Sequence, residues 1–215
     1  MDSHLLRFRK DVTYSLIDLE TFNLALNFQE NRPRQVGLLE IKGEEIINTL
    51  DLNVNWPEDP HLKMGEGAIK HTKYVQAEHD RTAIHHKEAF AQFWPILCRT
   101  DYILGHNILG FDIYLLKGWA ELMGKEWKWM VPKIIDTDAL ARGYKLNIPY
   151  DPKKHNLTEY QYRLGGTIVR GCKTNLTAMG KEFSIEHDYD SLHSALSDIE
   201  LNLKVWNKLK YKIEI

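Results

Sequence analysis

The stretch VTYSLIDLE, residues 12–20, constrains the fold more than any other part of the chain. Residues 12–19 are mostly apolar, β-branched or aromatic, which predicts a buried strand. The stretch ends on Asp18 and Glu20, two positions apart. Because side chains alternate between the faces of a strand, both carboxylates lie on one side, at the carboxyl end where open α/β sheets bind ligands. The stretch therefore predicts a sheet with an acidic site at its edge.

Two later segments also end on a carboxylate. NILGFD, residues 107–112, follows an apolar run at 102–104 that predicts a second strand, and a helix is predicted over 111–123. Asp112 then falls in the first helical turn, where the helix dipole favours negative charge. HSALSD, residues 193–198, lies in a helix that we expect to be capped by Asp190 and Ser191. His193 would reach the position of Asp198 only from the start of that helix, so we expect His193 to be mobile.

Four carboxylates and no thiolate make a set of hard oxygen ligands, which suits magnesium or manganese rather than zinc or an iron–sulfur cluster. Four like charges brought together repel one another, so such a cluster requires divalent cations. Two ions roughly 3.5–4 Å apart can bridge a scissile phosphate, activate water and stabilise the departing oxygen. The residues by themselves therefore predict phosphodiester hydrolysis assisted by two metal ions.

Each motif has an ordinary explanation when it is considered alone. An Asp-x-Glu pair is common, and Asn107 and Phe111 could be a turn residue and a core aromatic. The order and placement of all three motifs outweigh these alternatives. Asp136 and Asp138 are different, because an Asp-Thr-Asp after an apolar strand is more often a helix cap than a metal ligand, and we leave both out of the site.

The three segments resemble the exonuclease motifs of the DEDD superfamily, which includes proofreading exonucleases, ribonuclease T and oligoribonuclease. A histidine five residues before the last aspartate is typical of the DEDDh branch, and His193 stands at that position. The resemblance implies a ribonuclease H-like α/β fold and two Mg²⁺ ions, replaceable by Mn²⁺, on Asp18, Glu20, Asp112 and Asp198. It also implies that His193 is the general base. The residues that it implies in substrate binding are Thr21, Phe22, Leu24 and Asn107.

The same resemblance implies the reaction: 3′–5′ removal of nucleoside 5′-monophosphates from single-stranded ends. Three residues separate Asn107 from Phe111, as in exonuclease domains fused to DNA polymerases, and residues 134–165 also resemble phage-type polymerase exonucleases. DNA is therefore the favoured substrate. The alternatives are an exoribonuclease or oligoribonuclease, and a non-catalytic nucleic-acid-binding or polymerase-accessory module. Any polymerase or replication partner would bind in trans.

The remaining sequence predicts one domain, 1–215, with a mixed five-stranded sheet flanked by helices, of which three strands are antiparallel and two are parallel. Residues 34–41 and 44–52 form a hairpin that turns at Lys42-Gly43. Residues 53–80, rich in Pro, Gly, His and charge, are expected to form an irregular insertion or flap. Residues 85–98 form an amphipathic helix, and His85-His86 with Glu88 suggests a helix start more readily than a metal site.

A net charge of −2 and a pI near 6.6 argue against a large basic face that coats nucleic acid. A local basic groove remains, with candidates Arg142, Lys145, Lys153, Lys154, His155, Arg163, Arg170 and Lys173. The sequence has no membrane segment, and the start of the chain lacks the apolar stretch of a signal peptide, so we expect no membrane partner and a cytoplasmic location. Oligomeric state is not predicted.

Overall fold

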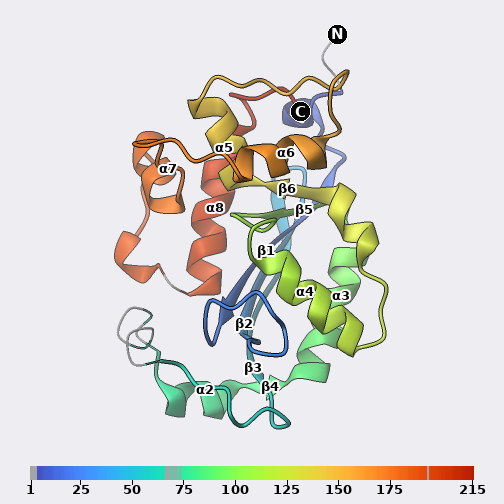
Figure 1. Ribbon diagram of the computed structural model, residues 1–215, viewed down its shortest axis with the longest axis vertical. Coiled ribbons are helices and arrows are strands. Elements are labelled where there is room, and N and C mark those ends of the chain that lie inside the picture. The colour runs from blue at the N-terminus through green and yellow to red at the C-terminus, as the bar shows by residue number, and fades with distance from the viewer. Residues whose placement is uncertain (1–3, 66–68, 70–71, 73, 193) are drawn as a thin grey trace.

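The computed structural model describes residues 4–65, 69, 72, 74–192 and 194–215. One six-stranded sheet, ordered β4-β3-β2-β1-β5-β6, runs through the molecule (Figure 1). Its strands are β1 (Thr13–Thr21), β2 (Pro33–Lys42), β3 (Glu45–Asn55), β4 (Ile84–His85), β5 (Tyr102–Gly105) and β6 (Ile134–Asp136). The helices are α2 (Gln76–Thr82), α3 (His86–Arg99), α4 (Asp112–Leu122), α5 (Thr137–Lys145), α6 (Leu157–Gly165), α7 (Leu176–Glu182) and α8 (Ala195–Leu209). Short 3₁₀ turns lie at η1 (Leu6–Phe8), η2 (Lys128–Lys133) and η3 (Tyr189–Ser191).

The sheet contains the five strands that the sequence predicts and one more. β1, β2 and β3 are antiparallel neighbours, while β5 pairs parallel with β1 and β6 pairs parallel with β5. The hairpin turns where predicted, and Gly43 supplies the positive φ of +64° that its tight turn requires. The additional strand, β4, consists of two residues that pair with the end of β3. The predicted fold class is thus confirmed, with the strand count corrected from five to six.

Alternation along the central strands divides the core into two layers. Ile17 and Leu38 belong to the cluster beneath α3 and α4, whereas Leu16 and Leu39 belong to the cluster beneath α5, α7 and α8. Figure 1 shows these two groups of helices on opposite sides of the strands. Asp18 has the parity of Leu16, so its side chain is directed toward the α8 face.

The start of α8 differs from the prediction. Asp190 and Ser191 lie in the 3₁₀ turn η3, and the helix begins at Ala195, where the Ser194 side chain caps it by accepting the N–H of Ser197 at 3.3 Å. A short side chain with an oxygen acceptor is what a helix N-cap requires, and Ser194 provides it after η3 has ended. Asp198 consequently lies in the first turn of α8, nearer to its start than predicted.

Gly37 allows this end of α8 to lie directly on the sheet. It pairs with Asp18 across the β1–β2 ladder, and a Cβ on Gly37 would come within 2.7 Å of the Ala195 backbone. The Ala195 N–H also donates to the Gln35 side chain at 3.3 Å. Gly37 therefore brings the first turn of α8 next to the end of β1.

Two large aromatic residues belong to the core: Trp119 and Trp206 have 0% and 2% of their surface exposed. The 53–80 segment is less irregular than predicted, because β3 extends to Asn55 and α2 begins at Gln76. None of the helices in the described part of the chain is both long and apolar enough to cross a membrane.

Candidate functional site

The carboxylates predicted from distant parts of the sequence meet at the carboxyl end of β1. Ligand oxygens of Asp18, Glu20 and Asp198 all lie within 4.8 Å of one another. Asp18 and Glu20 come from alternate positions of β1, and Asp198 comes from the first turn of α8 on the same face of the sheet. The i, i+2 spacing in a strand and the close approach of α8 at Gly37 produce this arrangement.

Asp112 joins the cluster from α4, which covers the other face of the sheet. It is 5% exposed, and its Oδ1 accepts the backbone N–H of Leu19 at 3.0 Å. This bond ties the first turn of α4 to the residue between Asp18 and Glu20. The structure thus brings four carboxylates from β1, α4 and α8 to one end of the sheet.

The electrostatics of the cluster are dominated by burial and by repulsion between its acids. Burial, with a contribution from Asp112, Glu20 and Asp198, raises the pKa of Asp18 well above its usual value. Burial also raises the pKa of Glu20 to about 7 and that of Asp112 to about 8. Without a cation, therefore, the folded protein favours protonation of these carboxyl groups near neutral pH.

Arg34, which the sequence did not single out, is the cation that the structure places against this cluster. Its Nη2 lies 3.1 Å from Oε2 of Glu20, and it lowers the pKa of Glu20 against the larger effect of burial. Arg34 is 5% exposed and lies beneath the Tyr74 ring, with 5.0 Å between the guanidinium carbon and the ring centroid. Arg34 is the second residue of β2, the antiparallel partner of β1, and it precedes Gln35, which pairs with Glu20; a basic residue at the start of that strand is the sequence signal that could have identified it.

Asp136 is the helix cap that the sequence predicts, and it has a second role. Its side chain accepts the N–H groups of Asp138 and Ala139 at the start of α5. The same carboxylate accepts the N–H groups of Asn107 and Leu109, each at 3.0 Å. Asp136 therefore fixes the loop between β5 and α4, which carries Asn107 to the site. Leaving Asp136 out of the ligand set agrees with these contacts.

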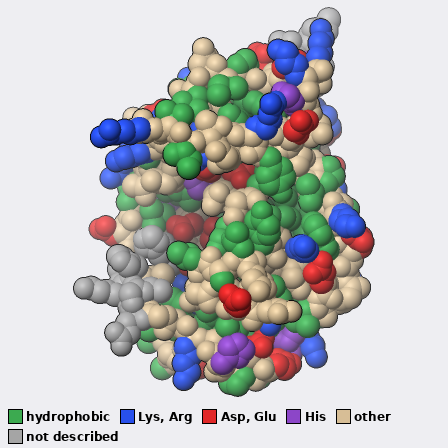
Figure 2. Space-filling view, viewed as in Figure 1, with side chains coloured by type: hydrophobic (Ala, Val, Ile, Leu, Met, Phe, Trp, Pro, Cys, Tyr) green, Lys and Arg blue, Asp and Glu red, His purple; other side chains and the backbone are tan. Residues whose placement is uncertain are grey.

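A cavity of about 750 Å³ opens beside the carboxylates. Its walls include Asp18 and Asp198 from the cluster, Asn107 and His106 from the β5–α4 loop, and Lys173 and Lys181 from around α7. Asn107 has a φ of 59°, a left-handed conformation that asparagine tolerates better than most residues. Figure 2 shows acidic side chains recessed near the middle of one face, with Lys and Arg side chains projecting above them. The cavity thus combines an acidic floor with basic side chains on its wall.

The predicted basic groove is reduced to fewer residues. Lys173 lines the cavity. Arg142 instead pairs with Asp138 at 2.8 Å and donates to backbone carbonyls at the end of α6, and Lys145 pairs with Glu182. These two side chains hold helices together. Lys181, which the sequence did not suggest, lines the cavity beside Lys173.

The other predicted substrate-binding residues have different surroundings. Phe22 is 8% exposed and packs in the core cluster under α3 and α4, which leaves little of its ring for contact with a substrate. Leu24 is 87% exposed and remains a candidate. The Thr21 hydroxyl donates to the backbone carbonyl of Asn23 at 2.6 Å, which shapes the loop after β1. The prediction for His193 falls outside the described residues.

This arrangement of a mixed sheet, two helical layers and a carboxylate cluster at the end of the central strand is that of a nuclease of the exonuclease class. The sequence matches the family described as exonuclease (RNase_T) over residues 15–206, and the chain belongs to this family. The recognition of a DEDD-type exonuclease-family enzyme from the three motifs is therefore confirmed. A comparison with curated proteins by sequence found no match.

Solved structures of exonuclease I have the same fold. One, described as suggesting how processivity is achieved, has a TM-score of 0.70 and 17% identity. Escherichia coli exonuclease I in complex with a dA16 oligonucleotide also has a TM-score of 0.70, with 18% identity. Each match covers 94% of this chain and 41% of the exonuclease I chain. This chain therefore spans less than half the length of these relatives, and the likeness extends to the fold.

Proposed function

We propose that this protein is a two-metal 3′–5′ exonuclease that shortens single-stranded DNA and releases nucleoside 5′-monophosphates. The observation that carries the proposal is the meeting of Asp18, Glu20, Asp112 and Asp198 at one end of the sheet, beside an open cavity. Of the reaction classes that such a cluster serves, phosphodiester hydrolysis also agrees with membership of the exonuclease family.

The donor set fits divalent cations. All four ligands are carboxylates, which are the oxygen ligands that Mg²⁺ and Mn²⁺ prefer. Glu20 and Asp112 have raised pKa values of about 7 and about 8, so bound cations would remove the cost of keeping the groups ionised at neutral pH. When bound, such ions supply an activated water and neutralise charge on the phosphate and the leaving oxygen.

The remaining steps, proton transfer and substrate binding, are assigned to side chains of the protein. We assign His193 to accept the proton of the attacking water, on the family resemblance, as the P–O3′ bond breaks and the shortened strand takes a proton on its 3′-oxygen. Asn107, held by the Asp136 contact to its N–H, lines the cavity and would contact the terminal nucleotide. Lys173 and Lys181 would attract the phosphate backbone. Arg34 would keep one oxygen of Glu20 engaged while the other faces the cluster.

Two observations favour DNA over RNA. Residues 134–165 resemble segments of phage-type DNA polymerase exonucleases. Structures with the same fold include E. coli exonuclease I with dA16 and with dT13. An exoribonuclease or oligoribonuclease is the alternative enzyme, and a non-catalytic nucleic-acid-binding module is the alternative outside catalysis. No feature of the described residues points to a polymerase partner, so the proposal names nucleic acid alone.

The test uses 5′-labelled single-stranded DNA and RNA of one sequence, each incubated with the protein in Mg²⁺, in Mn²⁺ and in chelator. We expect stepwise shortening from the 3′ end with metal, faster on DNA, with nucleoside 5′-monophosphates as product. Faster cleavage of RNA would mean that RNA and not DNA is the preferred substrate, while the reaction class would stay the same. Binding of both strands without any cleavage would overturn the enzyme and favour the binding module.

Contaminating nucleases are excluded by matched variants. Asp18→Asn removes one carboxylate of the cluster, whereas Glu45→Gln removes an exposed carboxylate at the start of β3. Activity that disappears in the first variant and persists in the second belongs to this protein. Equal activity in both would mean that the cluster is not the catalytic site.

A further inference from the structure

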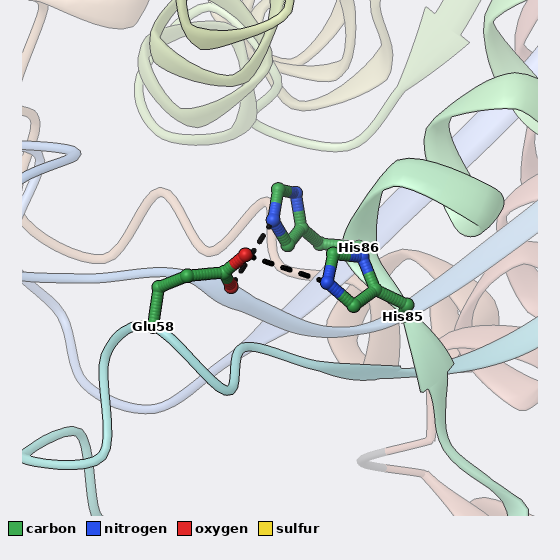
Figure 3. A group of neighbouring side chains, drawn as sticks. All are labelled: Glu58, His85 and His86. Atoms are coloured by element: carbon green, nitrogen blue, oxygen red, sulfur yellow. Dashed lines mark ion pairs between the residues drawn. The ribbon is translucent and has the colours of Figure 1, made fainter.

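A second group of metal-ligating side chains lies at the β4 edge of the sheet, apart from the carboxylate cluster at β1. It consists of Glu58, His85 and His86, whose ligand atoms all lie within 4.8 Å of one another (Figure 3). His85 ends β4 and His86 begins α3, while Glu58 comes from the loop after β3. Two strands, β3 and β2, separate β4 from β1, so this group does not share ligands with the carboxylate cluster.

The spacing within the group agrees with a shared metal ion. Nε2 of His85 lies 3.4 Å from Oε1 of Glu58, and Nε2 of His86 lies 3.3 Å from Oε2. Charge-assisted hydrogen bonds between such groups are usually about 2.7–2.9 Å long. Two ligands of a tetrahedral zinc ion, with bonds of about 2.0–2.1 Å, are separated by about 3.3 Å. The two imidazoles therefore face the carboxylate at the distance that a zinc ion between them would set.

The surroundings hold the three side chains in place. His86 is 3% exposed and stacks on Trp56, with 4.3 Å between ring centroids and 6° between planes. Trp56 itself donates from Nε1 to the Pro33 carbonyl at 2.7 Å. On the other side of Glu58, Asp59 pairs with Arg32 at 2.9 Å. The loop is thus anchored on both sides of Glu58, so little ordering is left for a ligand to impose.

The proton positions must change when a metal binds. Nδ1 of His85 accepts the N–H of Lys87 at 3.2 Å, which places the proton of the neutral ring on Nε2, facing Glu58. Nδ1 of His86 has no hydrogen-bond partner among the described residues, so nothing described there fixes that tautomer. Binding through both Nε2 atoms moves the His85 proton to Nδ1 and gives up the long contact with Lys87, whose N–H can turn to water because His85 is 40% exposed.

We infer that Glu58, His85 and His86 form a zinc site. Two imidazoles and one carboxylate are a zinc ligand set, and the nitrogen donors disfavour Mg²⁺. Because Glu58 and His85 are 54% and 40% exposed, water can reach the group and complete the coordination. The ion would tie the loop after β3 to the start of α3, and so secure the short edge strand β4. This inference is independent of the proposed exonuclease activity.

The test counts zinc bound per chain by equilibrium dialysis and elemental analysis. The double variant Asp18→Asn, Asp198→Asn has a weakened carboxylate cluster. It should still bind the one zinc ion per chain that Glu58, His85 and His86 hold. Adding Glu58→Gln and His85→Ala to the double variant should remove this zinc ion. Adding Glu88→Gln and His61→Ala to the double variant instead should leave the zinc ion bound, because these exposed residues lie outside the group. Equal zinc content in all three proteins would overturn the site.

The variant that lacks Glu58 and His85 could lose zinc because it misfolds. Two measurements therefore use proteins that keep Glu58, His85 and His86. X-ray absorption of zinc bound to the Asp18→Asn, Asp198→Asn protein should show two imidazole ligands, and Co²⁺ in its place should give the visible spectrum of a tetrahedral ion. Zinc at a hundred times its dissociation constant should raise the unfolding temperature by on the order of 5–10 °C. Oxygen ligands alone, or no bound zinc, would mean that Glu58 merely pairs with the two rings.

Discussion

Asp112 and Asp136 are both buried carboxylates that follow or end the parallel strands β5 and β6, but they are held in different ways. The Asp136 side chain accepts four backbone N–H groups, from the β5–α4 loop and the start of α5. The Asp112 side chain accepts the N–H of Leu19 and faces other carboxylates. Burial raises the pKa of Asp136 to about 6 and that of Asp112 to about 8. A buried carboxylate is thus stable without a cation when N–H donors surround it, and requires one when other acids do.

The largest effect that this comparison predicts is on activity. Asp112→Asn keeps an oxygen for the Leu19 N–H but removes a charge from the cluster, so cleavage of DNA should fall by about 10²–10³-fold, the scale of losing one charge-stabilising group. Initial rates at saturating Mg²⁺ measure this. The metal-free variant should unfold at the same temperature as the wild type or higher, because repulsion is relieved. A fall in both activity and unfolding temperature would make Asp112 a structural acid like Asp136.

Asp136→Asn should instead lower the stability of the fold. An amide has one oxygen, so its NH₂ group would face either Leu109 or the N–H groups that Oδ1 now accepts. Leaving a buried donor unpaired costs roughly 1–3 kcal/mol of unfolding free energy. Urea unfolding of the metal-free protein measures this, with Asp112→Asn as the matched control. If Asp136→Asn proves as stable as the control, the four N–H contacts do not hold the loop.

The pH dependence of the metal-free protein tests the carboxylate cluster as a whole. Glu20 and Asp112 have folded pKa values of about 7 and about 8, above the unfolded values near 4, so the folded state holds more protons between those limits. Stability must then decrease as pH rises from about 5 to about 8, by on the order of 5 kcal/mol, because each group held protonated loses about 1.4 kcal/mol per pH unit. Unfolding in chelator across this range measures the decrease, and saturating Mg²⁺ should abolish it. Stability that rises over this range without metal would contradict the raised pKa values.

The smallest expected effect concerns the loop after β1. Leu24 is 87% exposed, so Leu24→Ser should change the unfolding free energy by less than about 0.5 kcal/mol. If Leu24 contacts the substrate, KM for single-stranded DNA should rise several-fold while kcat changes little. Val75→Ser, another exposed apolar residue, serves as control. An unchanged KM would remove Leu24 from the substrate-binding residues and leave Asn107 as the candidate that lines the cavity.

Much of the fold could be predicted because its signals are local. The run at residues 12–19 forms most of β1, the hairpin turns at Gly43, and Asp136 caps α5, since period-two apolar patterns, a glycine with positive φ and a cap each act within a few residues. β4 could not be predicted, because two residues carry no periodic pattern and pair only where β3 has already been placed. The burial of Phe22 could not be predicted from its place after β1, because it depends on the packing of α3 and α4.

The sequence by itself determined the family, the mixed sheet and the four carboxylates, because the spacing of residues within a strand or helix fixes which side chains share a face. Only the tertiary structure decided what lies around those carboxylates. Arg34 reaches Glu20 across a strand pair, Gly37 brings α8 onto the sheet, and Asp136 reaches back to the loop of Asn107. Glu58 likewise meets His85 and His86 across 27 or more positions of chain, a juxtaposition that long-range packing creates and no local pattern encodes.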